Sequence, residues 1–334
     1  RQRQMCIRDR IISEIDPQAN IKYFAFVAFI IALAGSIQDI AIDALRIESA
    51  EIEDQGNLAA GYQFGYRIAI LVASSLALII ASNFSWTFAY KLMALITGLN
   101  IIITMIISTE NKNLTLKKLN HIDTMIEPIK DFFERFGLKM AAILLLIIAS
   151  YRLTDIVMGP MANPFYIDMG YTLSEIGYIV KVVALISTII GVFVGGILIK
   201  KFGLYKSLLI GAFLVMITNL LFSYTAITDK NLTLLASIVA SDSLAAGIVG
   251  TVNITFLTSL VSQKYTGFQY ALLTSVMTFT GTIFKGFSGV IVESFQSLYG
   301  FNYGWMSFYI FTSCLALPAI LLIISKKGFF VNSD

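Results

Sequence analysis

Residues 21–46 read IKYFAFVAFIIALAGSIQDIAIDALR, and this stretch decides the fold class. From Ile21 to Ile37 it carries one charged side chain, that of Lys22. A helix that crosses a bilayer needs about 20 consecutive, mostly apolar residues. The stretch is therefore predicted to be a transmembrane helix that carries acidic and basic side chains near its end.

The rest of the chain repeats this pattern. Of the 334 residues, 57% are hydrophobic and only 13% are Asp, Glu, Lys or Arg, whereas about 25% of the residues in a soluble domain are charged. A water-soluble globular protein is therefore excluded. We predict an all-α integral membrane protein in the lipid bilayer with about nine transmembrane helices, at residues 21–44, 58–82, 87–108, 140–160, 173–199, 205–226, 231–261, 268–291 and 304–325.

The basic residues between these helices predict their orientation, because loops rich in Lys and Arg stay in the cytoplasm. Loops on one side hold only Lys22 and Lys230. Loops on the other side hold Arg46, Lys112, Lys117, Lys118, Lys130, Arg135, Lys139, Lys200, Lys201, Lys206, Lys264, Lys326 and Lys327. We expect the second side, which includes the C-terminus, to be cytoplasmic, in a multi-pass membrane protein.

The longest predicted loop, residues 109–139, divides the helices into three before it and six after it. Its stretch Ile126–Phe136 is amphipathic and is predicted to lie at the membrane interface as a helix. Transporters built of two six-helix halves have such a central loop. We predict a partial N-terminal bundle, a central cytoplasmic loop, a C-terminal six-helix bundle and a cytoplasmic tail, at residues 11–108, 109–139, 140–326 and 327–334, in a chain truncated at its N-terminus.

The opening residues 1–10, RQRQMCIRDR, are polar and aperiodic, and we expect them to be a non-native leader. Their four arginines against Asp9 account for the whole net charge of +3. No basic surface for nucleic acid is therefore predicted. Two cysteines and one histidine give no disulfide framework and no His-based metal site, so we expect no metal. We also expect no cofactor, and a monomer.

The end of the first predicted helix combines two acids with a base. Asp39 and Asp43 are four residues apart and Arg46 follows three later, so the three side chains share one helix face. We expect Asp39, deeper in the span, to carry a proton, and Asp43 to pair with Arg46. The alternative is a latch between bundles that binds no proton. Arg67, near the end of its span, is predicted to be a gating charge or to reach water by its long side chain.

Five more charges fall within later predicted spans, where an ionisable group faces a cavity by default. Arg152 and Asp155 are a possible i, i+3 pair and are predicted to act in gating. Lys181, Asp242 and Lys285 are predicted to contact substrate. The two lysines suit anionic groups such as carboxylates or phosphates.

Several stretches together resemble one known family. They are Gly35–Arg46, Gly61–Arg67, Ala73–Leu78, Tyr151–Asp155, Ser187–Gly196 and Gly267–Ser275. They are similar to the AmpG muropeptide permease family, which belongs to the major facilitator superfamily. The resemblance implies the major facilitator superfamily fold and proton-driven import of anhydro-muropeptides, the fragments released by cell-wall turnover, across the bacterial inner membrane.

The resemblance also implies roles for individual residues. Asp39 and Asp43 stand where the family has its paired acids, and Gln269 stands at the family's glutamine on the eleventh helix. Gln38, beside the paired acids, is predicted with Gln269 to contact the substrate. Transport of acetyl-CoA or another solute by a member of the same superfamily remains an alternative. A membrane-embedded hydrolase or transferase, or a sensor that does not transport, is a further alternative, but an enzyme is not expected because no paired nucleophile and base is found.

Overall fold

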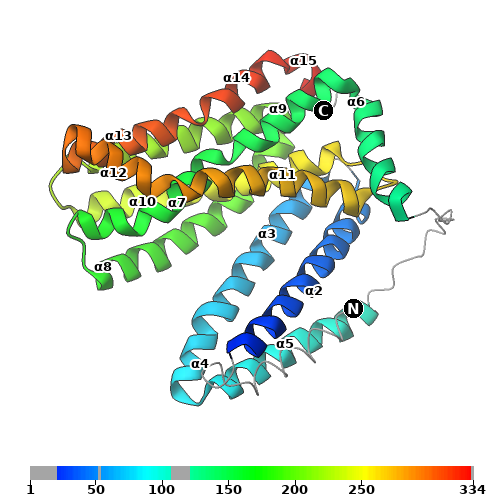
Figure 1. Cartoon of the computed structure of the whole chain (residues 1–334), viewed down its shortest axis with the longest axis horizontal. Coiled ribbons are helices and arrows are strands. Elements are labelled where there is room, and N and C mark those ends of the chain that lie inside the picture. The colour runs from blue at the N-terminus through cyan, green and yellow to red at the C-terminus, as the bar shows by residue number, and fades with distance from the viewer. Residues whose placement is uncertain (1–20, 52–53, 107–120, 332–334) are drawn as a thin grey trace. The chain divides into compact units, whose positions relative to one another are not determined.

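The computed structural model describes residues 21–51, 54–106 and 121–331. Within these ranges every regular element is a helix (Figure 1). Six of the described helices are long and apolar enough to cross a membrane. The all-helical fold predicted from the sequence is therefore confirmed, while the predicted count of nine transmembrane helices stays a prediction. The predicted leader at residues 1–10 and residues 109–120 of the predicted central loop lie outside the described residues.

Two compact units make up the chain: residues 1–46 with 65–127, and residues 47–64 with 128–334. The helices before the central loop follow the predicted apolar stretches, because each stretch supplies enough apolar residues for several turns. A π-helical segment, η2, interrupts the second of these helices without ending it. The elements are α2 (Ile21–Glu48), α3 (Gln55–Leu71), η2 (Val72–Leu76), α4 (Ala77–Asn83) and α5 (Trp86–Ile106).

The helices after the central loop are more often broken than the sequence predicts. Another π-helical segment, η3, joins α8 to α9. The elements are α6 (His121–Tyr151), α7 (Leu153–Asp168), α8 (Leu173–Tyr178), η3 (Ile179–Val183), α9 (Ala184–Thr225), α10 (Leu232–Leu260), α11 (Thr266–Gly286), α12 (Ser288–Tyr299), α13 (Phe301–Cys314), α14 (Leu317–Ser325) and α15 (Lys327–Val331).

Two glycines divide long helices at places where the backbone turns. Gly137 has φ 70° and ψ 155°, and it separates the amphipathic start of α6 from the apolar remainder. Gly203 has φ 77° and ψ 169°, and it divides the 42-residue α9. Positive φ of this kind strains residues that carry a Cβ atom, whereas glycine adopts it readily. The helix predicted over Ile126–Phe136 and the predicted boundary between residues 199 and 205 are thereby confirmed.

Several predicted helices are interrupted in the structure, and the one predicted over residues 304–325 breaks between Cys314 and Leu317. The helix predicted over residues 140–160 breaks at Arg152 and then continues to Asp168. The sequence also predicts an end or a kink at Pro160 and Pro164, but α7 runs through both prolines, so an end there is wrong. The helix predicted over residues 268–291 ends near Phe287, where the next helix begins.

Small residues bring α9 and α10 into close contact. A Cβ atom added to Gly191 would lie 2.1 Å from the carbonyl oxygen of Leu244, and one added to Gly247 would lie 2.4 Å from that of Thr188. The Thr251 hydroxyl donates a hydrogen bond of 3.1 Å to the Val192 carbonyl across this contact. Small residues allow such close packing of membrane helices.

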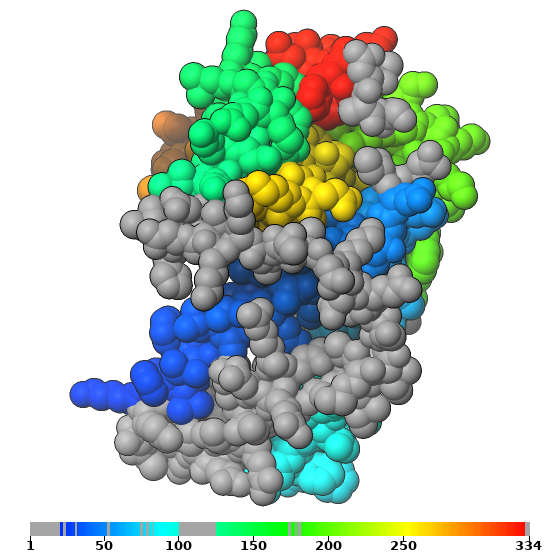
Figure 2. Space-filling model, turned by 90° about the vertical axis from the view of Figure 1, so that its right-hand side faces the viewer, coloured from blue at the N-terminus to red at the C-terminus, as the bar shows by residue number. Residues whose placement is uncertain are grey.

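The second unit, residues 47–64 with 128–334, contains two apolar cores. In one of them, α6, α9, α10 and the last helices pack together, and the rings of Phe136 and Phe329 meet at 5.8 Å. Figure 2 shows α6 in green beside the red C-terminal helices. In the other core, Phe165 lies edge-on to Tyr309 with the ring centroids 4.9 Å apart. These cores hold the helices that carry the buried charges.

Candidate functional site

The first group of predicted site residues lies at the end of α2. Asp43 and Arg46 form the expected ion pair, with 3.7 Å between Oδ1 and Nε. Only 4% of the Arg46 side chain and 15% of the Asp43 side chain are exposed. Asp39 is exposed, and no described residue forms an ion pair with it. The Gln38 side chain is partly buried, and its Oε1 has no hydrogen-bond partner among the described residues.

This geometry separates the two acids of α2 by environment. Arg46 compensates the charge of Asp43, whereas the carboxylate of Asp39 is open to its surroundings. An acid that exchanges protons must be reachable and must not be held permanently by a cation. The arrangement suits proton exchange at Asp39, and that role stays a prediction. Arg67 lies on α3 with a partly buried side chain, and its gating role also stays a prediction.

The second group lies inside the C-terminal bundle, where four helices contribute polar side chains. On α7, Arg152 Nη2 lies 3.8 Å from Asp155 Oδ2. On α10, Asp242 Oδ1 accepts a hydrogen bond of 2.9 Å from the Thr218 hydroxyl of α9. The two carboxylates lie within electrostatic range of each other. The structure therefore brings together Asp155 and Asp242, to which the sequence analysis assigned different roles.

Aromatic hydroxyls join this second group. Tyr166 of α7 and Tyr309 of α13 lie within electrostatic range of Asp242. Tyr309 is completely buried, and its hydroxyl has no hydrogen-bond partner among the described residues. Nearby on the same helices, Thr312 donates a hydrogen bond of 2.8 Å to Asn219. No sequence signal identified these neutral groups, because tyrosines and threonines in apolar helices are most often packing residues.

The third group surrounds Gln269 on α11. Its Oε1 accepts hydrogen bonds from Arg135 Nη2 at 2.9 Å and from the Ser262 N–H at 2.7 Å. Its Nε2 donates to the Pro128 carbonyl and to Asp131 Oδ2, each at 2.8 Å. The side chain thus ties the amphipathic start of α6 to α11. Protein partners already occupy this amide, and the predicted contact of Gln269 with substrate stays a prediction.

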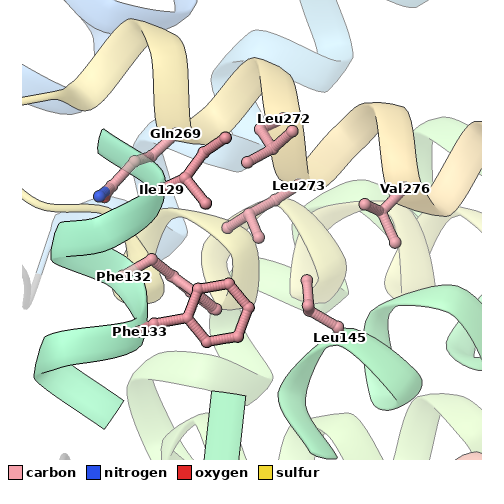
Figure 3. A pocket seen from close by; sticks show the side chains of 8 residues that line it. All are labelled: Ile129, Phe132, Phe133, Leu145, Gln269, Leu272, Leu273 and Val276. Carbon is pink, nitrogen blue, oxygen red and sulfur yellow. The ribbon is translucent and has the colours of Figure 1, made fainter. Parts of the chain in front are cut away.

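An apolar cavity of about 200 Å³ adjoins Gln269 between α6 and α11. Figure 3 shows the rings of Phe132 and Phe133 facing Leu273 and Leu145 across it, with Gln269 at one end. No charged side chain lines it; the lining residues are Ile129, Phe132, Phe133, Leu145, Gln269, Leu272, Leu273 and Val276. On the same α11, Thr266 donates a hydrogen bond to Glu48 at the end of α2. No pattern in the sequence predicts this contact, because the two residues are 218 positions apart.

The two predicted lysines are not brought into these groups by any described contact. Lys285 is in the last turn of α11 and exposed, and it forms no ion pair with a described residue. Lys181 is in η3, and its side chain lies outside the described residues. Contact of either lysine with substrate stays a prediction. The described residues contain no cluster of His, Cys, Asp and Glu that could hold a metal ion.

A separate ion pair joins the start of α8 to the connection between α9 and α10. Lys230 Nζ lies 2.8 Å from Glu175 Oε2, and the Thr172 N–H donates to the same oxygen at 2.7 Å. These donors, above all Lys230, lower the pKa of Glu175 from 4.5 to about 2. The pair fastens the start of α8 to the connection before α10.

Comparison with known proteins gives consistent relatives. Residues 12–285 match the sequence model of the Major Facilitator Superfamily. The AmpG 4 protein of Rickettsia conorii is 32% identical over 321 residues, which cover 93% of this chain and 74% of the relative. The AmpG 1 protein of the same organism is 30% identical over 334 residues, covering 95% and 77%. The anhydromuropeptide permease of Escherichia coli is 29% identical over 313 residues, covering 93% and 61%.

Proposed function

The chain belongs to the major facilitator superfamily, among the AmpG proteins, and from this premise we propose that it imports anhydro-muropeptides together with protons. It is a transporter and not an enzyme. The observation that carries the choice of substrate is the similarity to the anhydromuropeptide permease, which extends over 93% of this chain. The proposed cargo is a small sugar and peptide fragment of the cell wall.

The α2 carboxylates support the coupling to protons. The Asp43–Arg46 pair is neutral, so protonation of the exposed Asp39 removes the remaining negative charge of this helix face. Neutral and charged forms of Asp39 then favour different states of the rocking halves. Inward proton flow supplies about 1.4 kcal/mol per pH unit and about 2.3 kcal/mol per 100 mV. This energy is enough to concentrate a neutral or anionic solute.

The proposed topology has nine spans and a cytoplasmic C-terminus in the inner membrane. The uneven distribution of Lys and Arg supports it, because basic loops stay in the cytoplasm. The break at Gly203 supports the count, since it separates the predicted spans 173–199 and 205–226, which are merged in one element. In this arrangement residues 109–139 are the central cytoplasmic loop between a three-helix part and a six-helix bundle, and the protein acts as a monomer.

Uptake in a bacterium that lacks its own anhydromuropeptide permease tests the proposal. Cells that express this chain should accumulate a labelled anhydro-disaccharide tripeptide, and an uncoupler should abolish the accumulation. Asp39→Asn should lower uptake by about tenfold or more, because the exchangeable charge is lost. Asp54→Asn is the matched control, since Asp54 is exposed at the start of α3 and lies outside the predicted spans.

Two results would overturn the proposal. Uptake that persists with an uncoupler, or that stays proton-coupled in Asp39→Asn, would remove the role of this acid. Uptake of labelled acetyl-CoA without uptake of the muropeptide would favour the alternative substrate. Asp54→Asn should transport like the unchanged chain, and a loss there would show that the assay reports on expression instead of proton coupling.

A further inference from the structure

The charged residues inside the C-terminal bundle lie beside interruptions in its helices. Between α6 and α7 the backbone of Arg152 leaves the helical conformation, with φ −106° and ψ 7°. Three residues later on α7 is Asp155, and the π-helical η3 packs against α10, which carries Asp242. Discontinuous membrane helices often form ion sites in transporters, and π-helical turns are frequent at functional sites.

Helix α9 contacts both α7, which carries Asp155, and α10, which carries Asp242. The Arg152–Asp155 contact of 3.8 Å is long for an ion pair, and Asp155 Oδ2 has no hydrogen-bond partner among the described residues. Asp242 accepts a single described hydrogen bond, from Thr218 at 2.9 Å. Both carboxylates are partly buried, and each is held by fewer donors than its oxygens can accept.

Tyr309 contributes a completely buried hydroxyl group near Asp242. Tyr309 is 0% exposed, and its hydroxyl has no partner among the described residues. This hydroxyl lies within electrostatic range of Asp242 and of Tyr166. A buried polar group without a partner costs free energy, and each such group in a native structure calls for an explanation. A hydroxyl beside a carboxylate can donate to the ionised form and accept from the protonated form.

Among the described side chains, the positive and negative charges near Asp155 and Asp242 are unequal in number. From α7 come Arg152, Asp155 and the hydroxyl of Tyr166; from α10 comes Asp242, and from α13 comes Tyr309. The nearest groups of α9 are the neutral Thr218 and Asn219. One guanidinium thus faces two carboxylates in a helical interior, and a net charge there is costly. Lys181 is on the adjoining η3, with its side chain outside the described residues.

We propose that Asp155 and Asp242 form a proton-exchange site inside the C-terminal bundle, in addition to the carboxylates of α2. One proton binds to a carboxylate oxygen of the pair, and Arg152 compensates the acid that stays ionised. Thr218 positions Asp242 through its hydrogen bond without binding the proton itself. The site binds a proton whether or not the cargo is a muropeptide, so it does not depend on the substrate proposed above.

Infrared difference spectroscopy on the full chain in phospholipid vesicles tests this site in the absence of substrate. Steps of pH should reveal the carbonyl stretch of a protonated carboxyl group that disappears as the pH rises. Asp242→Asn should remove the contribution of this pair to the band, because Asp155 then pairs with Arg152 alone, and the contribution of Asp39 should remain. Asp168→Asn is the matched control, since this aspartate at the end of the same α7 accepts a hydrogen bond of 2.9 Å from Trp305, and the band should remain.

A milder variant keeps the test valid if Asp242→Asn does not fold, as judged by gel filtration. Thr218→Val removes the donor to Asp242, so the midpoint of the band should move by about one unit toward higher pH. A band that is absent at every pH, or that is unchanged in both Asp242→Asn and Thr218→Val, would overturn the proposal. Loss of muropeptide uptake with an intact band would instead count against the proposed cargo and leave this site standing.

Discussion

The α2 helix and the C-terminal bundle contain similarly apolar spans but surround their charges differently. In α2 none of the apolar window is buried within the structure, whereas half of the α9 window is buried. The Asp43–Arg46 pair of α2 forms within one helix, while Asp242 is held by a hydroxyl from a second helix. Apolar composition alone therefore does not determine how firmly a membrane helix is held; the contacts between helices do.

This difference has a functional counterpart. Asp39 is exposed on a helix with few contacts, which suits an acid that meets water during transport. Asp155 and Asp242 are partly buried, and Asp242 is held by a hydrogen bond from the neighbouring α9. In α2 the proton-exchanging acid is accessible, whereas the C-terminal bundle retains the proton that it binds. Substitutions should consequently have larger effects on stability in the C-terminal bundle than in α2.

The largest difference is expected between two glycine substitutions. Gly247→Ala places a Cβ atom 2.4 Å from the Thr188 carbonyl oxygen, in backbone that cannot move aside, and should lower the free energy of unfolding by about 3 kcal/mol. Gly35→Ala on α2 meets no atom within 4 Å and should be neutral or stabilising by up to about 1 kcal/mol, because alanine favours the helix.

Tryptophan fluorescence during thermal unfolding in detergent measures both variants. In a Trp86→Phe background, Trp305 of α13 reports on the C-terminal bundle alone, since these are the two tryptophans of the chain. Gly247→Ala should lower the midpoint of the Trp305 transition, and Gly35→Ala should leave it unchanged. Equal midpoints in the two variants would contradict the contrast between the regions.

A smaller effect is expected where the C-terminal bundle holds the start of α6. Gln269→Ala leaves Arg135 and the Ser262 N–H without their shared acceptor and the Pro128 carbonyl without its donor. If these bonds together contribute about 1.4 kcal/mol, local opening should increase about tenfold. Limited trypsin digestion in detergent measures this opening through cleavage after Lys130.

Ser275→Ala is the control for this digestion. Ser275 is also on α11, but its hydroxyl bonds only to the Ala271 carbonyl of its own helix. Cleavage after Lys130 should therefore proceed as in the unchanged chain. Similar cleavage rates for Gln269→Ala and Ser275→Ala would show that the apolar contacts of Phe132 and Phe133 hold the segment without the glutamine.

The sequence predicts local features well where one helix contains them. The pairing of Asp43 with Arg46 and of Arg152 with Asp155 follows from spacings of three residues, which place both side chains on one face. The approach of Asp242 to Asp155 depends on which helices pack together, and no spacing encodes that. Tyr309 gives no signal either, because a buried tyrosine in an apolar span looks like any packing residue.

Some helix interruptions can likewise be predicted from the local sequence, whereas others depend on packing between helices. Gly203 follows Lys200 and Lys201, so a polar break in an apolar run predicts a boundary there. The break at Arg152 has no glycine or proline beside it, and its position depends on the contacts of α7 with neighbouring helices. Pro160 and Pro164 are helix breakers by local rules, yet α7 continues through both because its packed surroundings outweigh the local preference.

The smallest effect is expected at the exposed pair between Glu175 and Lys230, which has no counterpart on α2. The pKa of Glu175 is lowered to about 2 in the folded protein, from 4.5. A lowered carboxyl pKa stabilises the folded state above the unfolded value and loses this contribution as the pH falls through the folded value. Glu175→Gln should therefore have a slightly lower unfolding midpoint than the unchanged chain at neutral pH.

Thermal unfolding at a series of pH values checks the sign of this contribution. The difference between Glu175→Gln and the unchanged chain should be constant above about pH 5 and should shrink as the pH falls from 4.5 toward 2. Lys230→Met should show the same pH dependence, because Lys230 is the main donor that stabilises the ionised carboxylate. The difference should be small because surface ion pairs contribute little. A difference in midpoint that grows on acidification would mean that Glu175 is bound in its protonated form. The start of α8 would then be held by the hydrogen bonds between Tyr171 and Asn231 instead.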